Sequence, residues 1–202
     1  MGTTTATSKS IADRGPEWTE EFQAVSDGYL WSMTERDRDG DGRARNARPR
    51  DAYGRPLPHG ATGEPTVSDA AAAEFARDPG AALAEAQRLL DADRPFHAHE
   101  VLEAVWKGAP AAQRELWRGL AQIAVGLTHL RRGNPVGARA LLLRAADRIG
   151  GDPGAGGGYG LDLPRLEADL RELADRAERG DRSADSATVR LVPDRGSGLA
   201  RG

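Results

Sequence analysis

Apolar positions recur with helical spacing through the middle of the chain. In the stretch "GAALAEAQRLLDAD", residues 80–93, Leu83, Ala86, Leu89 and Leu90 fall on one stripe. The longest periodic run, residues 109–133, keeps the same spacing. Its inward positions are Leu116, Leu120, Ile123, Leu127 and Leu130. Because side chains three and four positions apart share one face of an α-helix, both runs predict amphipathic helices.

Start and stop signals mark further helices. Pro95 opens "PFHAHEVLEAVWKG" at a first-turn position, and Asn134 followed by proline begins the segment after Gly133. Proline at the first turn, asparagine at the cap and glycine after the last turn are typical of helix ends. The additional helices are predicted at about residues 69–78, 95–108, 134–150 and 163–180.

The fold class follows from these elements and their short connections. No segment shows a convincing strand pattern. Helices joined by short loops pack as antiparallel neighbours. The sequence therefore predicts an all-α domain over residues 69–180, a compact bundle of about five helices packed as antiparallel helical hairpins.

The two ends differ from this region in composition. Residues 1–68 are rich in Gly, Pro and charged residues, apart from a short helix predicted between Glu17 and Met33. Such a composition buries too little apolar surface to order itself, so residues 1–68 are predicted to be a mostly disordered extension. Met33 is an alternative start position. The polar tail, residues 181–202, is also predicted to be disordered.

Composition narrows the function classes. The chain has no cysteine, which excludes disulfides, thiolate catalysis and thiolate metal sites. Its net charge of −3 predicts no global attraction to nucleic acid or to anionic membranes. No apolar run approaches the roughly 20 residues of a membrane span, and the first residues lack the apolar centre of a signal peptide. We expect a soluble, cytoplasmic protein with no membrane partner.

Three chemically active side chains share one face of the helix predicted over residues 95–108. At about 100° per residue, His99, Glu103 and Trp106 lie within roughly 60° of one another, whereas His97 and Glu100 point elsewhere. This helix has few large aliphatic residues, so that face must supply much of its burial. Buried polar groups need partners, and the pairing expected across one turn is His99 with Glu103, as imidazolium and carboxylate.

The long helix offers two more polar residues. Gln122 and His129 lie seven positions apart, beside the apolar stripe. If the two helices pack as a hairpin, either could face the three residues of the preceding helix. The candidate ligand pocket therefore consists of His99, Glu103, Trp106, Gln122 and His129.

These residues also carry a family resemblance. The pattern His-x-x-x-Glu-x-x-Trp, read at His99, Glu103 and Trp106, resembles the signature of the domain of unknown function 309 family. Residues 114–145 are similar to that family's next two helices, and residues 45–60 to the lead-in of one of its branches. The resemblance covers roughly residues 43–150. The resemblance implies a compact α-helical domain in which His99, Glu103 and Trp106 are important, and it implies no particular activity.

Three chemistries remain open for this set. His99, Glu103 and His129 are candidate ligands for a divalent metal, although "HEVLE" departs from the zinc-protease pattern because Glu103 replaces its second histidine. His99 and Glu103 are alternatively a catalytic acid–base pair without a metal. The third interpretation is a satisfied structural network that fixes helix register.

An arginine-rich segment lies in the N-terminal extension. Residues 43–55 carry five arginines and one tyrosine, which are residue types that contact nucleic-acid phosphates. We expect instead a solvated arm, or a segment that wraps the helical domain with Arg48 or Arg50 paired to surface acids. Nucleic acid is therefore an unlikely partner.

The leading hypothesis is a non-catalytic helical module that binds an unknown protein partner or small-molecule ligand at the candidate pocket. The alternative is an uncharacterised enzyme, metal-dependent or not, that uses His99 and Glu103.

Overall fold

The computed structural model describes residues 49–151 and 156–192. In chain order its six α-helices are α2 (Asp69–Arg77), α3 (Pro79–Asp91), α4 (Pro95–Gly108), α5 (Ala111–Arg131), α6 (Pro135–Gly150) and α7 (Leu163–Glu178). Two short 3₁₀ helices are η2 (Gly157–Tyr159) and η3 (Arg182–Ser186). Within the described ranges no strand forms, and strand-like pairing is limited to one bridge between Arg50 and Pro56. The predicted all-α class is confirmed, and α2 corresponds to the helix predicted at about residues 69–78, so the described residues form six α-helices where about five were expected.

The helix ends lie where the local signals place them. The Asn134 side chain accepts a hydrogen bond from the backbone N–H of Gly137, so it caps α6. Gly133 adopts a φ of 71°, the left-handed conformation that glycine accepts at the end of a helix. Ser68 likewise caps α2. None of the helices described is long and apolar enough to cross a membrane.

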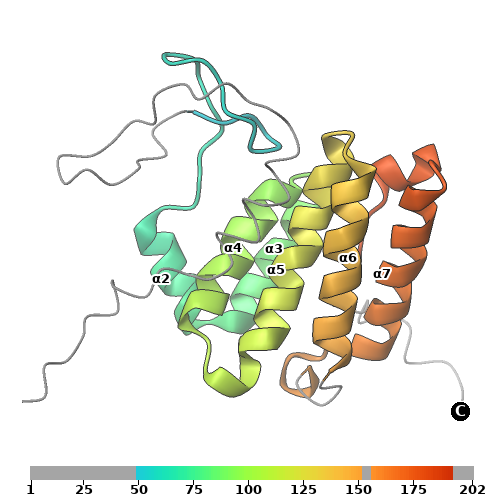
Figure 1. Ribbon diagram of the computed structural model, residues 1–202. Coiled ribbons are helices and arrows are strands. Elements are labelled where there is room, and N and C mark those ends of the chain that lie inside the picture. Colours follow the sequence, from blue (N-terminus) through green and yellow to red (C-terminus); the bar gives the residue numbers. More distant parts are fainter. Residues whose placement is uncertain (1–48, 152–155, 193–202) are drawn as a thin grey trace, which may run out of the picture. The chain divides into compact units, whose positions relative to one another are not determined.

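Each helix packs against its neighbour in sequence. The pairs α3–α4, α4–α5, α5–α6 and α6–α7 form successive hairpins, and α2 also packs on α4. Figure 1 shows α4, α5, α6 and α7 side by side. The central helix of this arrangement is α5, which is also the longest.

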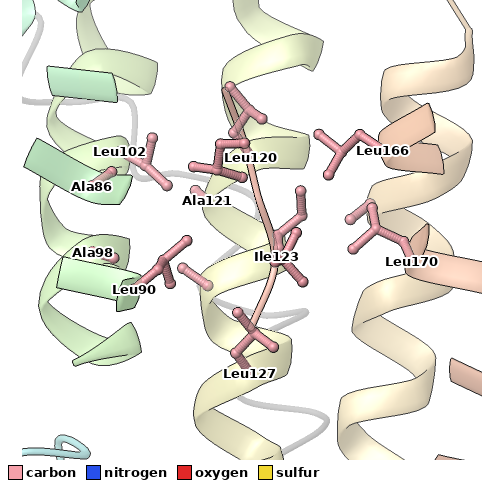
Figure 2. Packing of buried hydrophobic residues seen from close by; sticks show 14 of the residues in the cluster. Ala86, Leu90, Ala98, Leu102, Leu120, Ala121, Ile123, Leu127, Leu166 and Leu170 are labelled. Atoms are coloured by element: carbon pink, nitrogen blue, oxygen red, sulfur yellow. The ribbon is translucent and has the colours of Figure 1, made fainter. Parts of the chain in front are cut away.

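The core lies along the inward face of α5. Figure 2 shows Leu120, Ile123 and Leu127 of α5 between leucines of α3 and α4 on one side and Leu166 and Leu170 of α7 on the other. Every one of these α5 positions belongs to the predicted apolar stripe. Complete burial of a leucine or isoleucine side chain stabilises the folded state by about 1.5–3 kcal/mol.

Two glycines of α5 bring α6 close. A Cβ atom at Gly119 would lie 2.8 Å from Ile149 Cγ2, and one at Gly126 would lie 2.9 Å from Leu142 Cδ2. Since real Cβ atoms are not found at such distances, a larger residue at either position would force Ile149 or Leu142 to shift, so glycine favours the close α5–α6 contact.

The packed region extends beyond residues 69 and 180. Residues 49–67, here called the N-terminal strap, lie against one end of α4 and α5. Residues 187–192, the C-terminal strap, bury Val189 and Leu191 in the core cluster, with only 4% and 1% of their surface exposed. The wrapping expected as one alternative for the arginine-rich segment is seen in residues 49–55. Composition did not predict the order of residues 187–192, because that order depends on surfaces that distant helices supply. The helix predicted between Glu17 and Met33, the alternative start and residues 43–48 lie outside the described residues.

Candidate functional site

His99 is buried on the flank of α4. Ala98, Leu102 and Val105 of this helix point into the core, and His99 beside them has 7% of its surface exposed. Burial lowers the pKa of His99, an effect that the Glu103 carboxylate opposes and the charges of Lys107 and Arg132 reinforce. The ring is therefore neutral at neutral pH, which differs from the imidazolium expected for this pairing.

Glu103 lies next to His99 but is held more closely by another residue. Its Oε2 atom is 3.8 Å from His99 Nε2, which is longer than a hydrogen bond. Its Oε1 atom is 2.8 Å from Lys107 Nζ, one turn further along α4. The Glu103 side chain is 19% exposed, so the carboxylate remains available to a ligand. Lys107 was not predicted as a site residue, although its spacing of four from Glu103 is readable in the sequence.

Trp106 completes this face of α4. Its side chain is partly buried and packs against the core cluster. A tryptophan in this position combines a large apolar surface with one polar N–H group, which is why the residue is common at binding interfaces.

His129 lies in the last turn of α5 and contacts the start of α6. Its Nδ1 atom is 2.9 Å from Asn134 Nδ2, while Asn134 Oδ1 accepts from the Gly137 N–H. The cap fixes the orientation of the amide, so Nδ1 must be the acceptor and the neutral ring carries its hydrogen on Nε2. Burial lowers the pKa of His129 to about 4, and the charge of Arg132 acts in the same direction.

Gln122 also contacts α6. Its Oε1 atom accepts a hydrogen bond of 3.0 Å from Arg148 Nε, and Arg148 pairs with Glu115 as well. The structure thus brings His99 and Glu103 together on α4, whereas the described hydrogen bonds of Gln122 and His129 run to α6.

A metal centre needs several ligands at one point. Among the described residues, no group of three or more His, Asp or Glu side chains is arranged to hold a metal ion. The candidate ligands His99, Glu103 and His129 therefore do not form such a group.

The N-terminal strap covers the neighbouring end of α4. Arg132 Nε donates to the backbone carbonyl of Tyr53 at 2.8 Å, and the backbone N–H of Val67 donates to Glu100 Oε2 at 3.4 Å. Gly54 lies against the Phe96 ring so closely that a Cβ atom there would overlap it. Charged side chains of α4 and of the C-cap of α5 thus bind backbone groups of the N-terminal strap, at the Tyr53 turn and at Val67.

Arg50 shows how the arginine-rich segment is held. Its Nη1 atom donates to Gly54 O at 2.7 Å, and its guanidinium lies 5.9 Å from the centre of the Phe96 ring. Burial raises the pKa of Glu100, and the nearby Arg50 opposes that shift. This part of the segment wraps the helical domain, and its described hydrogen bond goes to a backbone carbonyl.

Comparison with known proteins identifies related sequences. Residues 83–141 match the family described as Domain of unknown function (DUF309). The uncharacterized protein YpuF of Bacillus subtilis (strain 168) is 34% identical over 84 residues, which are 41% of this chain and 48% of that protein. The chain thus spans about half the length of this curated relative. No solved structure matches the chain. The matched residues include all five candidate site residues.

Proposed function

We propose that this chain, whose residues 83–141 match the DUF309 family, is a non-catalytic helical module for binding a partner protein. The partner contributes an extended polypeptide segment. That segment lies on α4 beside His99, Glu103 and Trp106.

The observation that carries this proposal is the way the domain holds its own N-terminal strap. Glu100 of α4 accepts from the N–H of Val67, which lies in an irregular part of the strap, and Arg132 at the C-cap of α5 donates to the carbonyl of Tyr53, which lies in a turn. An extended segment leaves its backbone N–H and C=O groups unpaired, so it needs such partners when it leaves water. The α4–α5 surface supplies them from charged side chains.

The candidate residues continue this surface toward the C-terminal end of α4. Glu103 offers a partly exposed carboxylate to a backbone N–H or to a basic side chain. Trp106 is only partly buried, so part of its apolar surface is available to an apolar side chain of the partner. His99 lies beside Glu103 as a neutral ring, which can donate from one nitrogen and accept at the other. One polar group and one aromatic surface in adjacent turns are typical of peptide-binding sites.

The test is a selection from a phage-displayed library of linear peptides against the full chain. The selected peptides are then measured by titration against the Glu103→Gln and Trp106→Ala variants. We expect each substitution to weaken binding at least tenfold. The matched control is Glu172→Gln on the exposed face of α7, which should leave affinity unchanged. Selected peptides that bind both α4 variants as tightly as the parent chain would refute the proposal, as would a selection that yields no binder.

A second function has one observation in its favour. His99 is neutral and lies 3.8 Å from a carboxylate, so the two residues are candidates for proton transfer in an enzyme. The two functions differ in what they require at position 99. A supporting ring can be replaced by glutamine, which also donates and accepts, with at most a few-fold loss of peptide affinity. Proton transfer requires the imidazole itself.

A further inference from the structure

We propose that the α3 surface around Gln87 is a docking site for an extended partner segment with the pattern apolar–basic–apolar. In this structure the chain's own Val189, Arg190 and Leu191 occupy it. This site does not include the α4 residues described above, and the proposal depends on different contacts.

The Gln87 carboxamide holds the C-terminal strap by its backbone. Gln87 Oε1 accepts from the Leu191 N–H at 2.7 Å, and Gln87 Nε2 lies 3.4 Å from the Val189 carbonyl oxygen. Nε2 also donates to Asp91 Oδ1 at 2.9 Å, which fixes the orientation of the amide. One side chain thus pairs with an N–H and a C=O two residues apart, as a neighbouring β-strand would. Gln87 is buried, so this contact is shielded from water.

The side chains of the strap alternate in direction. Val189 and Leu191 are buried in the core cluster, whereas Arg190 is about half exposed. The Arg190 guanidinium lies 3.7 Å from the Asp91 carboxylate. The surface therefore selects two apolar residues separated by one basic residue, with charge complementarity at the outward position.

The C-terminal strap is held by hydrogen bonds between helix side chains and its backbone, as a bound peptide ligand would be. Among the described residues, no backbone–backbone hydrogen bond involves residues 188–192. The last such bond before them joins the Ala187 N–H to Ala184 O. At the start of the C-terminal strap, Arg131 Nη2 donates to the Ala187 carbonyl at 3.0 Å. Side chains of α3 and α5 make the hydrogen bonds, and nothing in those contacts requires the segment to belong to the same chain.

The direct test uses the full chain with Val189→Asp and Leu191→Asp, which removes the strap from its site. The probe is a fluorescently labelled synthetic peptide, SATVRLV, that copies residues 186–192. We expect saturable binding to this variant, followed by anisotropy, and binding at least tenfold weaker to the wild-type chain because its own strap competes. The control peptide carries aspartate in place of both apolar residues and should not bind. Adding Gln87→Leu, which keeps the side-chain size but removes both backbone contacts, should weaken binding at least tenfold.

Absence of binding to a double variant that retains its helical circular dichroism would overturn the proposal, as would equal binding of the aspartate peptide. If the double variant fails to fold, hydrogen exchange in the wild-type chain decides. We expect the Leu191 amide to exchange at least tenfold faster than the Ile123 amide in α5, because the strap opens without global unfolding. Equal rates would make the strap a fixed part of the fold and overturn the proposal. A wild-type dimer that Gln87→Leu abolishes would assign the site to a second copy and would also overturn it.

Discussion

Replacing Asn134 with alanine removes two interactions at once, because this side chain caps α6 and also donates to His129. Loss of the cap costs about 1 kcal/mol. Loss of the donor leaves the buried His129 Nδ1 without this hydrogen bond, which costs a further ~1–3 kcal/mol. We expect the free energy of unfolding at pH 8 to fall by about 2–4 kcal/mol, measured by urea unfolding.

The control for this substitution is Asp162→Ala. Asp162 caps α7 by accepting from the Arg165 N–H at 3.1 Å, and this cap is exposed and serves no buried histidine. It should cost only about 1 kcal/mol. If Asn134→Ala is no more destabilising than Asp162→Ala, the His129 contact contributes nothing and the reasoning is wrong.

Burial of the same histidine makes stability depend on pH. The pKa of His129 is about 4 in the folded chain, against 6.5 for an ordinary histidine. Between these values the unfolded chain binds a proton that the folded chain does not. The contribution of His129 to stability is therefore complete above pH 6.5 and is lost as the pH falls toward 4, with a limit of about 3 kcal/mol.

Asn134→Asp is expected to weaken this dependence. An aspartate keeps the cap on α6, but it places a carboxylate where the amide donor faces His129 Nδ1. That carboxylate stabilises the imidazolium and raises the pKa of His129. Between pH 7.5 and pH 5 the variant should therefore lose less stability than the wild type. His97 and His99, whose pKa values burial also lowers, are the same in both chains and cancel in the comparison.

The measurements are urea unfolding at both pH values and an NMR titration of the His129 ring, assigned by its disappearance in His129→Gln. A wild-type ring that titrates near pH 6.5 would show that burial does not control this histidine. Identical pH dependence in the Asn134→Asp chain and the wild type would contradict the proposed role of the amide.

Three further substitutions test the packing. Gly54→Ala should release the N-terminal strap and speed its limited proteolysis, because a Cβ atom would overlap Phe96. Its control is Gly60→Ala, which has the same left-handed backbone but open space around it and should lower the free energy of unfolding by only about 1–2 kcal/mol. Gly126→Ala should lower the urea stability by about 1–3 kcal/mol through the clash with Leu142, and a gain would mean that α6 moves away freely. Leu170→Ala should cost about 2–5 kcal/mol in the same assay, and a loss below about 1 kcal/mol would contradict its place in the core.

Some features of the candidate site could be predicted from the sequence, and others depend on how the helices pack. The proximity of His99 and Glu103 is readable from the sequence, because residues four apart in a helix are always neighbours. The neutral state of the ring is not, since it depends on burial that several helices create. The contact of Gln122 with Arg148 joins residues 26 positions apart, and only the packing of α5 on α6 decides it.

The all-α class, the helix ends and the apolar stripe of α5 could all be predicted from local sequence patterns. These features depend on contacts within a turn or two, such as the Asn134 cap and the glycine stop at Gly133. The positions of the two straps and the burial of Val189 and Leu191 depend instead on how the helices pack. Two apolar residues in a polar segment show too weak a pattern for prediction, because their burial depends on Gln87 and the leucines of α3, a hundred residues away in the chain.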